Sequence, residues 1–423
     1  MLKTIINFLN QLNPDIIVQA PSRINLINPL DAVEGDFWMP SVAINGIENP
    51  LSVFFYIKKI EDTSTLKIYK IRKNIKEYKI ELTLKEEFIN DLSEMERKFS
   101  GKSGLIYSSI YRLCKTYSIL GKRFKNQKFE LGLLTTIPRQ SGLGGSAAII
   151  ISILYAFSHY FNIYNNLRYI KENEFPINKD TIAELATKIE DEDLKVTAGY
   201  GDRYVISRGG LCFCSYYGKL LHKKISKEPL AVYDRIDITY NITSLPIIIC
   251  FSGVTHESGS VHDKLRTIYL QEDPNILKNY SELAKISWKS RFALMRKDWK
   301  LLGEYFKKNT EIMNLVMKDA GFEYGIGRAN NILIKLIEDH PDVYAAKLTG
   351  AGGGGSVFAL VNPNKIHTVL LDWKKNLNDL IKNKGKLNKK DLNIPLEMRS
   401  QLLNAEFYKI KISNNGVSII EKN

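Results

Sequence analysis

The sequence has few cysteines, and none in the spacings that build metal or redox sites. Four occur, Cys114, Cys212, Cys214 and Cys250, without a C-x-x-C pair and without a histidine at zinc-finger spacing. This pattern excludes a zinc finger and a disulfide framework, and it favours a protein that stays reduced in the cytoplasm. Cys212 and Cys214 alternate on a predicted strand, where we expect them to be small buried hydrophobic side chains.

No stretch is long and apolar enough to cross a membrane. The most apolar run, Ala147 to Phe161, is shorter than the ~20 residues of a typical span and contains Ser152, Ser158 and His159. The first fifteen residues are interrupted by Asn and Gln, unlike the apolar core of a secretory signal. The run therefore predicts a buried helix, and we expect a soluble protein with no membrane partner.

A concentrated basic arm is also missing, although the formal net charge is +14. Lys and Arg residues are spread along the chain and diluted by acids, and no nucleic-acid recognition module is present. Much of the excess is Lys in a chain rich in Ile and Asn, which is typical of a compositional bias. We expect no nucleic-acid partner, whereas a mild positive field would help to collect anionic small molecules such as ATP.

The length and the order of the elements favour two lobes of mixed structure. A single core stops growing near ~250–300 residues, so the 423 residues predict two lobes, 1–225 and 226–423, with a division near 220–240. Strands are predicted at residues 52–58, 65–71, 128–134, 210–216, 247–251 and 357–360, and helices at 146–164, 181–190 and within 275–317. Strands and helices do not alternate strictly, which favours the α+β class. The Lys- and Asn-rich stretch 374–390 is predicted to be an exposed insertion or linker.

The most informative stretch is the glycine-rich segment 138–148, PRQSGLGGSAA, between a predicted strand and a predicted helix. At such a junction, free N–H groups and the positive end of the helix dipole attract anions. Gly142, Gly144 and Gly145 let the backbone approach phosphate oxygens, and Ser146 can cap the helix or reach a phosphate-bound Mg²⁺. The spacing fits neither a Walker A loop nor a Rossmann fingerprint, and a tight turn with a serine cap is the alternative.

A second glycine cluster lies in the segment 347–356, KLTGAGGGGS, just before a predicted strand. Five glycines are costly in conformational entropy unless the backbone needs unusual dihedral angles or a close approach. A flexible linker is the alternative. Linkers are flanked by polar residues, however, whereas predicted strands flank both sides of this cluster.

Two acidic residues and one arginine are further candidates for chemistry. Asp202 lies in a glycine-punctuated turn, where it either shapes the turn or faces a substrate hydroxyl. Glu190 is the first of four consecutive acids, Glu-Asp-Glu-Asp, at a predicted helix end. We expect most of these four side chains to be solvated. Phosphoryl transfer needs one carboxylate for the metal and often another near the nucleophile. Arg23 alternates with Ile24 and Leu26 on a predicted strand, and is either a surface residue or a cation that keeps a reactive carboxylate ionised.

Four motifs occur in the order seen in GHMP kinases: P-x-R-x-N-L at 21–26, P-x-x-x-G-L-G-x-S-A-A at 138–148, the Asp202 turn and the late glycine cluster. The chain resembles that superfamily over roughly residues 20–362. The resemblance implies a two-lobed α+β fold with a ribosomal-protein-like N-terminal lobe and a ferredoxin-like C-terminal lobe. It also implies ATP and Mg²⁺, and transfer of the γ-phosphoryl group to a hydroxyl or phosphate of a small molecule.

Within the superfamily, the loop at 137–149 and Asn28-Pro29-x-Asp31 resemble plant-type glucuronokinases, as does Ser258-Gly259-x-Val261-His262 with Arg266. Residues 347–355 and the Glu190-to-Asp202 spacing resemble heptose-phosphate kinases nearly as well. Both groups phosphorylate an anomeric hydroxyl, so the resemblance implies a sugar kinase with a uronic acid ahead of a heptose phosphate as acceptor. We expect the protein to be a monomer or a homodimer. The alternatives are a galactose-type or mevalonate-type kinase and a non-catalytic sugar sensor. The missing E-H-T-D motif weakens the galactose assignment.

The resemblance also implies roles for individual positions. The nucleotide phosphates would be bound by Gly142, Leu143, Gly144, Gly145, Ser146 and Ala147. Ser146 and Glu190 would hold Mg²⁺, and Asp202 would orient or deprotonate the attacking hydroxyl with Arg23 beside it. Asp31 would bind sugar hydroxyls together with Asp202, and the cluster Gly350, Gly352 and Gly353 would close the site around substrate and phosphate.

Overall fold

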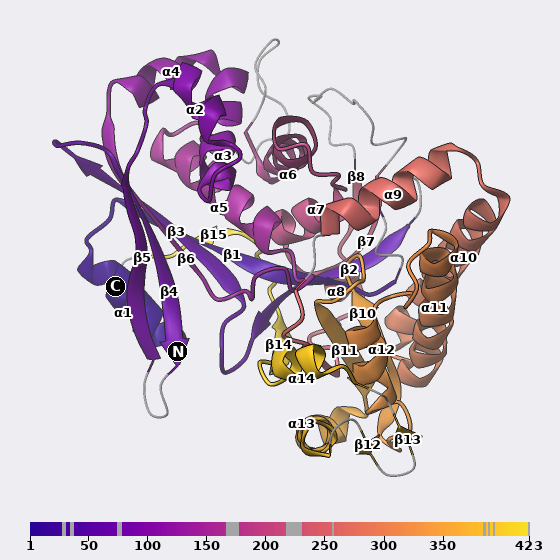
Figure 1. Ribbon diagram of the computed structural model, residues 1–423. Coiled ribbons are helices and arrows are strands. Elements are labelled where there is room, and N and C mark those ends of the chain that lie inside the picture. The colour runs from indigo at the N-terminus through magenta and orange to yellow at the C-terminus, as the bar shows by residue number, and fades with distance from the viewer. Residues whose placement is uncertain are drawn as a thin grey trace.

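The computed structural model describes residues 1–27, 31–33, 38–73, 78–165, 177–216, 231–255, 258–383, 386–387, 390–391 and 394–421. Helices surround a long, twisted β-sheet in this structure (Figure 1). The helices are α1 (Leu2–Gln11), α2 (Leu92–Met95), α3 (Gly104–Thr116), α4 (Ser118–Lys125), α5 (Gly145–Tyr160), α6 (Lys179–Lys188), α7 (Gly201–Arg208), α8 (Ile236–Thr239), α9 (Ser258–Leu270), α10 (Pro274–Arg296), α11 (Trp299–Asp319), α12 (Arg328–Lys335), α13 (Ile366–Lys382) and α14 (Leu396–Leu402). Within this described part of the chain, no helix is both long and apolar enough to cross a bilayer.

Thirteen of the described strands join into one sheet. They are β1 (Ile16–Asn25), β2 (Met39–Gly46), β3 (Ser52–Ile60), β4 (Thr65–Lys73), β5 (Tyr78–Glu87), β6 (Lys128–Thr135), β7 (Leu211–Tyr216), β8 (Ala231–Asp234), β9 (Ile247–Phe251), β10 (Val343–Thr349), β11 (Ser356–Val361), β14 (Glu406–Ile412) and β15 (Ser418–Ile419). The main path is β10-β11-β9-β14-β2-β1-β3-β6-β4-β5, with β7 and β15 paired to β2 and β1, and β8 paired to β7. Of these pairs, β4 with β6 is parallel. The predicted strands at 52–58, 65–71, 128–134, 210–216, 247–251 and 357–360 are confirmed with ends that differ by at most two residues.

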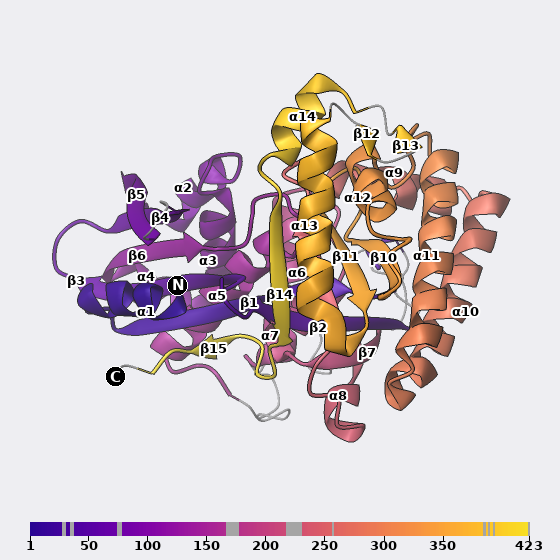
Figure 2. The same ribbon diagram turned by 90° about the horizontal axis from the view of Figure 1, so that it is seen from below.

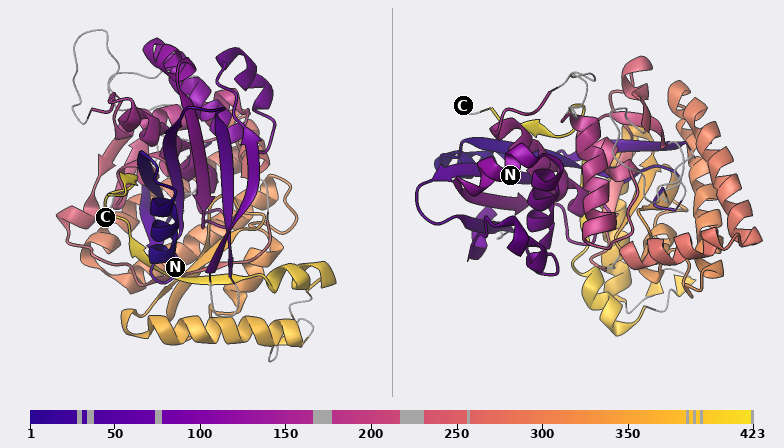
Figure 3. Two further views of the ribbon diagram at one scale, coloured as in Figure 1. Left: turned by 90° about the vertical axis from the view of Figure 1, so that its left-hand side faces the viewer. Right: turned by 90° about the horizontal axis from the view of Figure 1, so that it is seen from above.

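Both faces of the N-terminal part of the sheet are covered by helices. On β3, Phe55 faces a core shared with α5, while Phe54 and Tyr56 face a second core under α1. Alternate residues of a strand point to opposite faces, so a strand covered on both sides is apolar at nearly every position. Figure 3 shows α1 on the face of the sheet that is opposite to α5. This arrangement explains the continuous apolar run of β3.

Helix α5 lies at the centre of the N-terminal core. It contacts β1 and β3 on the sheet and α3, α6 and α7 beside it. Eleven of its residues are buried, which is why its sequence is apolar on nearly every side rather than along one stripe. The predicted buried helix is confirmed, and it ends at Tyr160.

The four cysteines are all free and buried, as expected for small hydrophobic side chains. Cys212 and Cys214 lie on β7, within the sheet. Burial raises the pKa of the Cys114 thiol to about 12, so this thiol stays protonated near neutral pH.

The prediction of an exposed linker at 374–390 is wrong for its first half. Residues up to Lys382 continue α13, in which Trp373, Leu377 and Leu380 are buried. These positions are three and four residues apart and share one helix face, whereas the Lys and Asn residues between them lie on the other faces. The indole N–H of Trp373 donates to the Leu333 carbonyl at 3.1 Å, which ties α13 to α12. Further along, β12 (Lys386–Leu387) and β13 (Lys390–Asp391) pair as a small separate sheet.

Strand β14 joins the two halves of the large sheet. It pairs with β9 on one side and with β2 on the other (Figure 2). The predicted division at residue 225 falls in 217–230, outside the described residues, and remains a prediction. The chain nevertheless returns to the N-terminal strands after β14, because β15 pairs with β1.

Candidate active site

The phosphate-binding loop predicted at 142–147 lies at the amino end of α5. Gly144 precedes the helix in the left-handed conformation, with φ of 76°. The Ala148 N–H donates to the Gly144 carbonyl at 3.0 Å, so the N–H groups of Gly145, Ser146 and Ala147 come before this first helical hydrogen bond. Ser146 is exposed, and the dipole of the 16-residue helix adds positive potential at the same place.

Ser141 supplies a second sign that the loop is shaped for a ligand. Its Oγ is buried and has no hydrogen-bond partner. Buried hydroxyls normally have a partner, so an unpartnered one beside free helix N–H groups is consistent with a site that binds an anion. On this evidence, the loop fits the phosphates of a nucleotide.

The two glycine clusters contact each other through their backbones. Gly142 has φ of 70°, and a Cβ atom on it would lie 2.8 Å from the Thr349 carbonyl oxygen. Gly350 has φ of 88°, and its Cβ would lie 3.2 Å from the Gly142 Cα. Glycine is therefore needed at both positions, for the dihedral angle and for the close approach. The contact brings the C-terminal cluster to the predicted phosphate loop.

The second cluster is held in place rather than flexible. Gly350, Gly352, Gly353 and Gly355 all have positive φ, which confirms the expectation of unusual backbone angles. The Gly353 N–H donates to the Ile326 carbonyl and the Gly355 N–H to the Val254 carbonyl, each at 2.9 Å. The Asn330 side chain of α12 donates to the Gly354 carbonyl, also at 2.9 Å. Strands β10 and β11 flank the cluster, which excludes the linker alternative.

Arg23 links the phosphate loop to Asp202. Its Nε and Nη2 donate to the two carboxylate oxygens of Asp202, and its Nη1 donates to the Gly142 carbonyl at 2.5 Å. The Arg23 side chain is 6% exposed, so the alternative of a surface arginine is wrong. Arg23 lies on β1 and shares one face of that strand with Asn25, whose Nδ2 donates to Asp202 Oδ1 at 3.1 Å.

Asp202 lies in the first turn of α7 rather than in a free turn, which corrects the local structure expected for residues 199–203. Its side chain is 15% exposed, so part of the carboxylate remains accessible. An acidic side chain in the first turn of a helix is stabilised by the helix dipole, which gives a physical reason for its place there. The structure therefore brings Asp202, Arg23 and the loop at Gly142 together.

Asp31 lies beside the same helix. Its Oδ2 accepts a hydrogen bond from the Gly201 N–H at 2.6 Å. Burial, together with the nearby charge of Asp202, raises the pKa of the Asp31 carboxyl from 3.8 to about 6. Asn28 and Pro29, which carried the motif around Asp31, lie outside the described residues. In this structure the contact of Asp31 is with the start of α7, and its predicted contact with sugar hydroxyls remains a proposal.

The acidic run after α6 forms a π-helix, η2 (Ile189–Asp193), and is not a solvated helix end as expected. Each of its acids contacts a cation from another part of the structure: Glu190 contacts Arg203, Asp191 contacts Arg266, Glu192 contacts Lys188 and Arg112, and Asp193 contacts Arg112. Apart from Glu192–Lys188, which are four residues apart, these pairs leave no periodic signal in the sequence, because Arg112, Arg203 and Arg266 lie on other helices. The run holds α3, α7 and α9 together.

The residues predicted to hold Mg²⁺ fit that role unequally. The exposed hydroxyl of Ser146 stands at the phosphate loop, where a metal bound to phosphate oxygens would be. Glu190 is buried, and its Oε2 accepts from Arg203 Nη2, so a metal would have to be met by Oε1. Over the described residues, no three His, Cys, Asp or Glu side chains gather as a metal site. Phosphate oxygens would then supply most of the ligands, as is usual for Mg²⁺ bound with a nucleotide.

Two family profiles match the chain. The GHMP kinases N terminal domain matches residues 104–210, and the GHMP kinases C terminal domain matches residues 292–379. Among named relatives, D-glycero-alpha-D-manno-heptose 7-phosphate kinase of Campylobacter jejuni is 26% identical over 294 residues, which cover 68% of this chain and 76% of the relative. Probable glucuronokinase 2 of Arabidopsis thaliana is 27% identical over 252 residues, covering 58% of this chain and 61% of the relative.

Solved structures agree on the fold. Lactococcus lactis galactokinase complexed with galactose superposes with a TM-score of 0.64 at 18% identity, covering 99% of both chains. A mevalonate kinase superposes with a TM-score of 0.60 at 19% identity, covering 95% of this chain and all of the other. The first profile includes the loop at Gly142 and the residue Asp202, and the second includes the glycine cluster that contacts Gly142. This chain therefore belongs to the GHMP kinase superfamily of small-molecule kinases, and it has the α+β fold of that superfamily.

Proposed function

We propose that the protein is an ATP- and Mg²⁺-dependent sugar kinase that transfers the γ-phosphoryl group to the anomeric hydroxyl of a uronic acid. The observation that carries this proposal is the position of Arg23, which contacts Asp202 with two nitrogens and the Gly142 carbonyl with the third. One rigid side chain thus sets the spacing between the phosphate loop and the carboxylate. Phosphoryl transfer depends mainly on such positioning and on electrostatic stabilisation.

At the nucleotide side, the N–H groups of Gly145, Ser146 and Ala147 bind the phosphates at the amino end of α5. Gly142 and Gly350 leave room for this because neither has a side chain where the two loops meet. Ser146 and Glu190 are the proposed metal ligands. When bound, Mg²⁺ offsets the negative charge of the phosphoryl group.

At the acceptor side, Asp202 accepts a hydrogen bond from the attacking hydroxyl and takes its proton. As the hydroxyl oxygen bonds to the γ-phosphorus, the bond from that phosphorus to the β,γ-bridging oxygen breaks and ADP leaves. Arg23 and Asn25 fix the carboxylate in one orientation. An ionised carboxylate has about four acceptor positions, so these contacts leave capacity for a substrate hydroxyl. Asp31, at the start of α7, is the second proposed sugar contact.

The choice of a uronic acid is supported by relatives and by motif positions rather than by a bound ligand. Two Arabidopsis thaliana relatives named as glucuronokinases are 27% and 28% identical to this chain. A heptose phosphate is the second candidate, supported by the Campylobacter jejuni heptose-phosphate kinase, whose match covers more of this chain. Both candidates share a sugar hydroxyl as the attacking group.

A panel of acceptors tests the proposal. ADP formation is measured with glucuronic acid, galacturonic acid, heptose 7-phosphate, galactose and mevalonate, and phosphorus NMR locates the new phosphate. We expect the highest kcat/KM with a uronic acid and a 1-phosphate product. A higher kcat/KM for heptose 7-phosphate would show that the acceptor is a heptose phosphate and would leave the proposed phosphoryl transfer to a sugar unchanged. ATP binding without ADP formation on any acceptor would instead support a sugar sensor.

A further inference from the structure

Helix α9 presents two side chains to the acceptor side of the site. His262 and Arg266 are four residues apart, so they lie one turn apart on the same helix face. Arg266 Nε donates to the Ala32 carbonyl at 2.8 Å, and its Nη2 donates to the Ala198 carbonyl at 3.3 Å. Ala32 follows Asp31, and Ala198 lies in the segment that leads to Asp202. This face of α9 is therefore directed at both loops of the proposed acceptor site.

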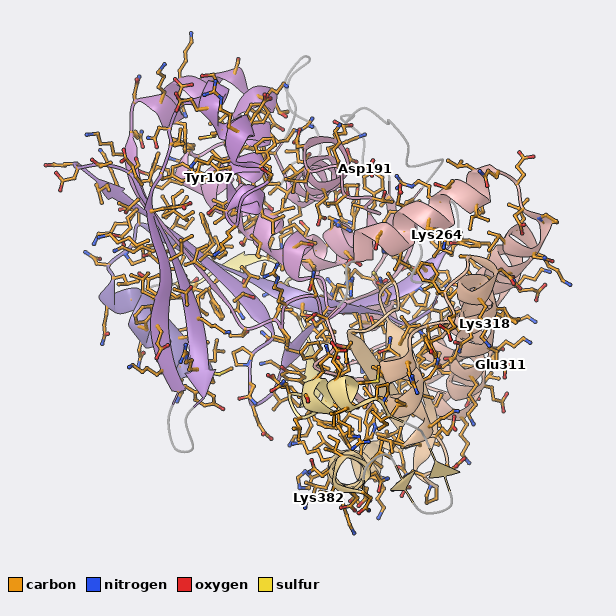
Figure 4. The ribbon with its side chains drawn as sticks, in the orientation of Figure 1. Tyr107, Asp191, Lys264, Glu311, Lys318 and Lys382 are labelled. Carbon is orange, nitrogen blue, oxygen red and sulfur yellow. The ribbon has the colours of Figure 1, made fainter. Side chains whose placement is uncertain are left out.

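An ion pair to the π-helix η2, in the N-terminal part of the chain, holds α9 in place. Arg266 Nη1 contacts Asp191 Oδ1 on the π-helix at 3.2 Å, and Arg266 is 8% exposed. Figure 4 labels Asp191 on this π-helix and Lys264 on α9, the two elements that this ion pair connects. Because Arg266 is anchored at three points, the turn that carries His262 is held in one place relative to Asp31 and Asp202.

His262 has a ring nitrogen that no protein group uses. Its Nδ1 is buried and has no hydrogen-bond partner, and the same is true of Arg203 Nε on α7. Asp202, Arg203, Arg266 and Arg23 are the charges that act on the imidazole, which places it among the residues of the site. Most buried polar atoms in proteins have a partner, so two unpaired atoms within one charged cluster are consistent with a site for a polar ligand.

The charged groups around His262 are themselves engaged with protein atoms. Arg23 contacts Asp202 and Gly142, while Nη1 of Arg203 donates to the Gly199 carbonyl at 3.0 Å and its Nη2 contacts Glu190. Burial lowers the pKa of His262 to about 4, so the imidazole is neutral near pH 7. A neutral imidazole donates with one nitrogen and accepts with the other, which suits a hydroxyl group better than an anionic group.

We propose that His262 is an acceptor-binding residue whose Nδ1 forms a hydrogen bond with a second hydroxyl of the acceptor, while Asp202 engages the reacting hydroxyl. This inference rests on the proposed sugar-kinase function and specifies the acceptor further. The acceptor carries at least two hydroxyls within reach of α7 and α9, and loss of the second one weakens binding. A site that hydrogen-bonds a substrate hydroxyl discriminates strongly against the analogue without it.

Two matched variants of the full-length protein test the role of Nδ1. The amide of asparagine lies close to the position of Nδ1, whereas the amide of glutamine lies closer to Nε2. We expect His262→Gln to raise the acceptor KM about tenfold, the effect of one lost hydrogen bond, with the ATP KM unchanged. His262→Asn should stay within about threefold of wild type. His367→Gln, an exposed histidine on α13, is the control for the substitution itself.

Deoxy acceptors provide the second readout. Wild type should discriminate against one deoxy analogue of its best acceptor, and His262→Gln should lose most of that discrimination. Wild-type kinetics in both variants, or equal impairment of both, would overturn the assignment to Nδ1. If wild type phosphorylates nothing, the proposed function fails, and calorimetric binding of glucuronic acid to wild type and His262→Gln then tests His262 alone: tenfold weaker binding supports the inference and equal binding overturns it.

Discussion

Two arginine–carboxylate pairs lie next to each other in this structure, and they differ in access to solvent. Arg23 and Asp202 have side chains that are 6% and 15% exposed, whereas Arg203 and Glu190 are 9% and 5% exposed. Asp202 and Arg203 are neighbours in the chain, so the two pairs meet at the first turn of α7. The carboxylate of Asp202 is therefore partly accessible to a substrate, whereas the carboxylate of Glu190 is enclosed by protein.

At one helix start, the proposed catalytic carboxylate of Asp202 therefore lies beside a buried ion pair that serves the fold. The partly open carboxylate of Asp202 is fixed in orientation but can still meet a substrate. Burial lowers the pKa of Arg203 to about 10, which reflects the penalty of placing its charge away from water. A buried pair of this kind is worth little over a well-packed apolar pair, but breaking it leaves an uncompensated charge. Replacing each member in turn should separate the two roles.

The largest effect is expected from Asp202→Ala. Loss of the group that takes the proton should lower turnover by roughly 10²–10⁴-fold, while ATP binding persists. Steady-state ADP formation and titration with a non-hydrolysable ATP analogue measure the two properties separately. Near-normal turnover in this variant would refute the role of Asp202.

Arg23→Lys should have the next largest effect. Lysine keeps the charge but cannot contact both oxygens of Asp202 and the Gly142 carbonyl at once. We expect kcat/KM to fall by roughly 10- to 100-fold, because a catalytic group misplaced by about 1 Å can cost up to ~100-fold. Arg72→Lys on β4, where the arginine side chain is 69% exposed, is the control and should be close to wild type. If Arg23→Lys were as active as wild type, the spacing argument would fail.

Glu190→Gln should change stability more than turnover. It removes the carboxylate that faces Arg203 and should lower the free energy of unfolding by about 3 kcal/mol. Since Glu190 is also a proposed metal ligand, the half-saturating Mg²⁺ concentration should rise. Urea denaturation and a Mg²⁺ titration of activity measure the two effects. Glu192→Gln, at a more exposed pair, is the control; a lower stability with an unchanged Mg²⁺ requirement would leave Glu190 as a structural partner only.

The smallest effect is expected at Asp31, where a carboxylate meets a backbone N–H instead of an arginine. The pKa of Asp31 is about 6 in the folded protein and 3.8 ordinarily, so the folded state binds the proton more tightly than the unfolded state. The contribution of Asp31 to the free energy of unfolding therefore falls as the pH rises from about 3.8 to about 6. Asp31→Asn keeps an acceptor for the Gly201 N–H and removes the charge. At about pH 7.5 it should unfold with a free energy ~1–2 kcal/mol higher than wild type, and near pH 4 the gain should vanish. A gain that grows toward acid pH would contradict this sign.

Local composition was enough to predict the two glycine clusters and the strands and helix beside them. Their chemistry lies in residues next to each other, and the left-handed angles at Gly142 and Gly350 explain why glycine was needed. Contacts between distant residues could not be predicted from local patterns. Arg23 and Asp202, for example, are 179 positions apart, and the packing of α7 on β1 brings them together. Asn25 was missed as well, although its place two residues after Arg23 on one strand face was a usable signal.

Charge patterns misled in two places for the same reason. The acidic run 190–193 and the Lys- and Asn-rich stretch from 374 both look solvated when only the polar letters are counted. In the structure the acids contact cations from three other helices, and the lysines cover the outer faces of α13. Sequence reasoning could not supply those cations, because ion pairs between distant helices have no periodicity to detect.

The return of β14 and β15 to the first strands limits how this protein can be dissected. A fragment ending near residue 225 would lack the strands that hydrogen-bond to the free edges of β1 and β2, and such bare edges readily pair with other chains. We therefore expect that a fragment of residues 1–225 does not fold on its own. Binding experiments on this enzyme need the intact polypeptide, and a nick between the halves should be tolerated better than removal of the last twenty or so residues.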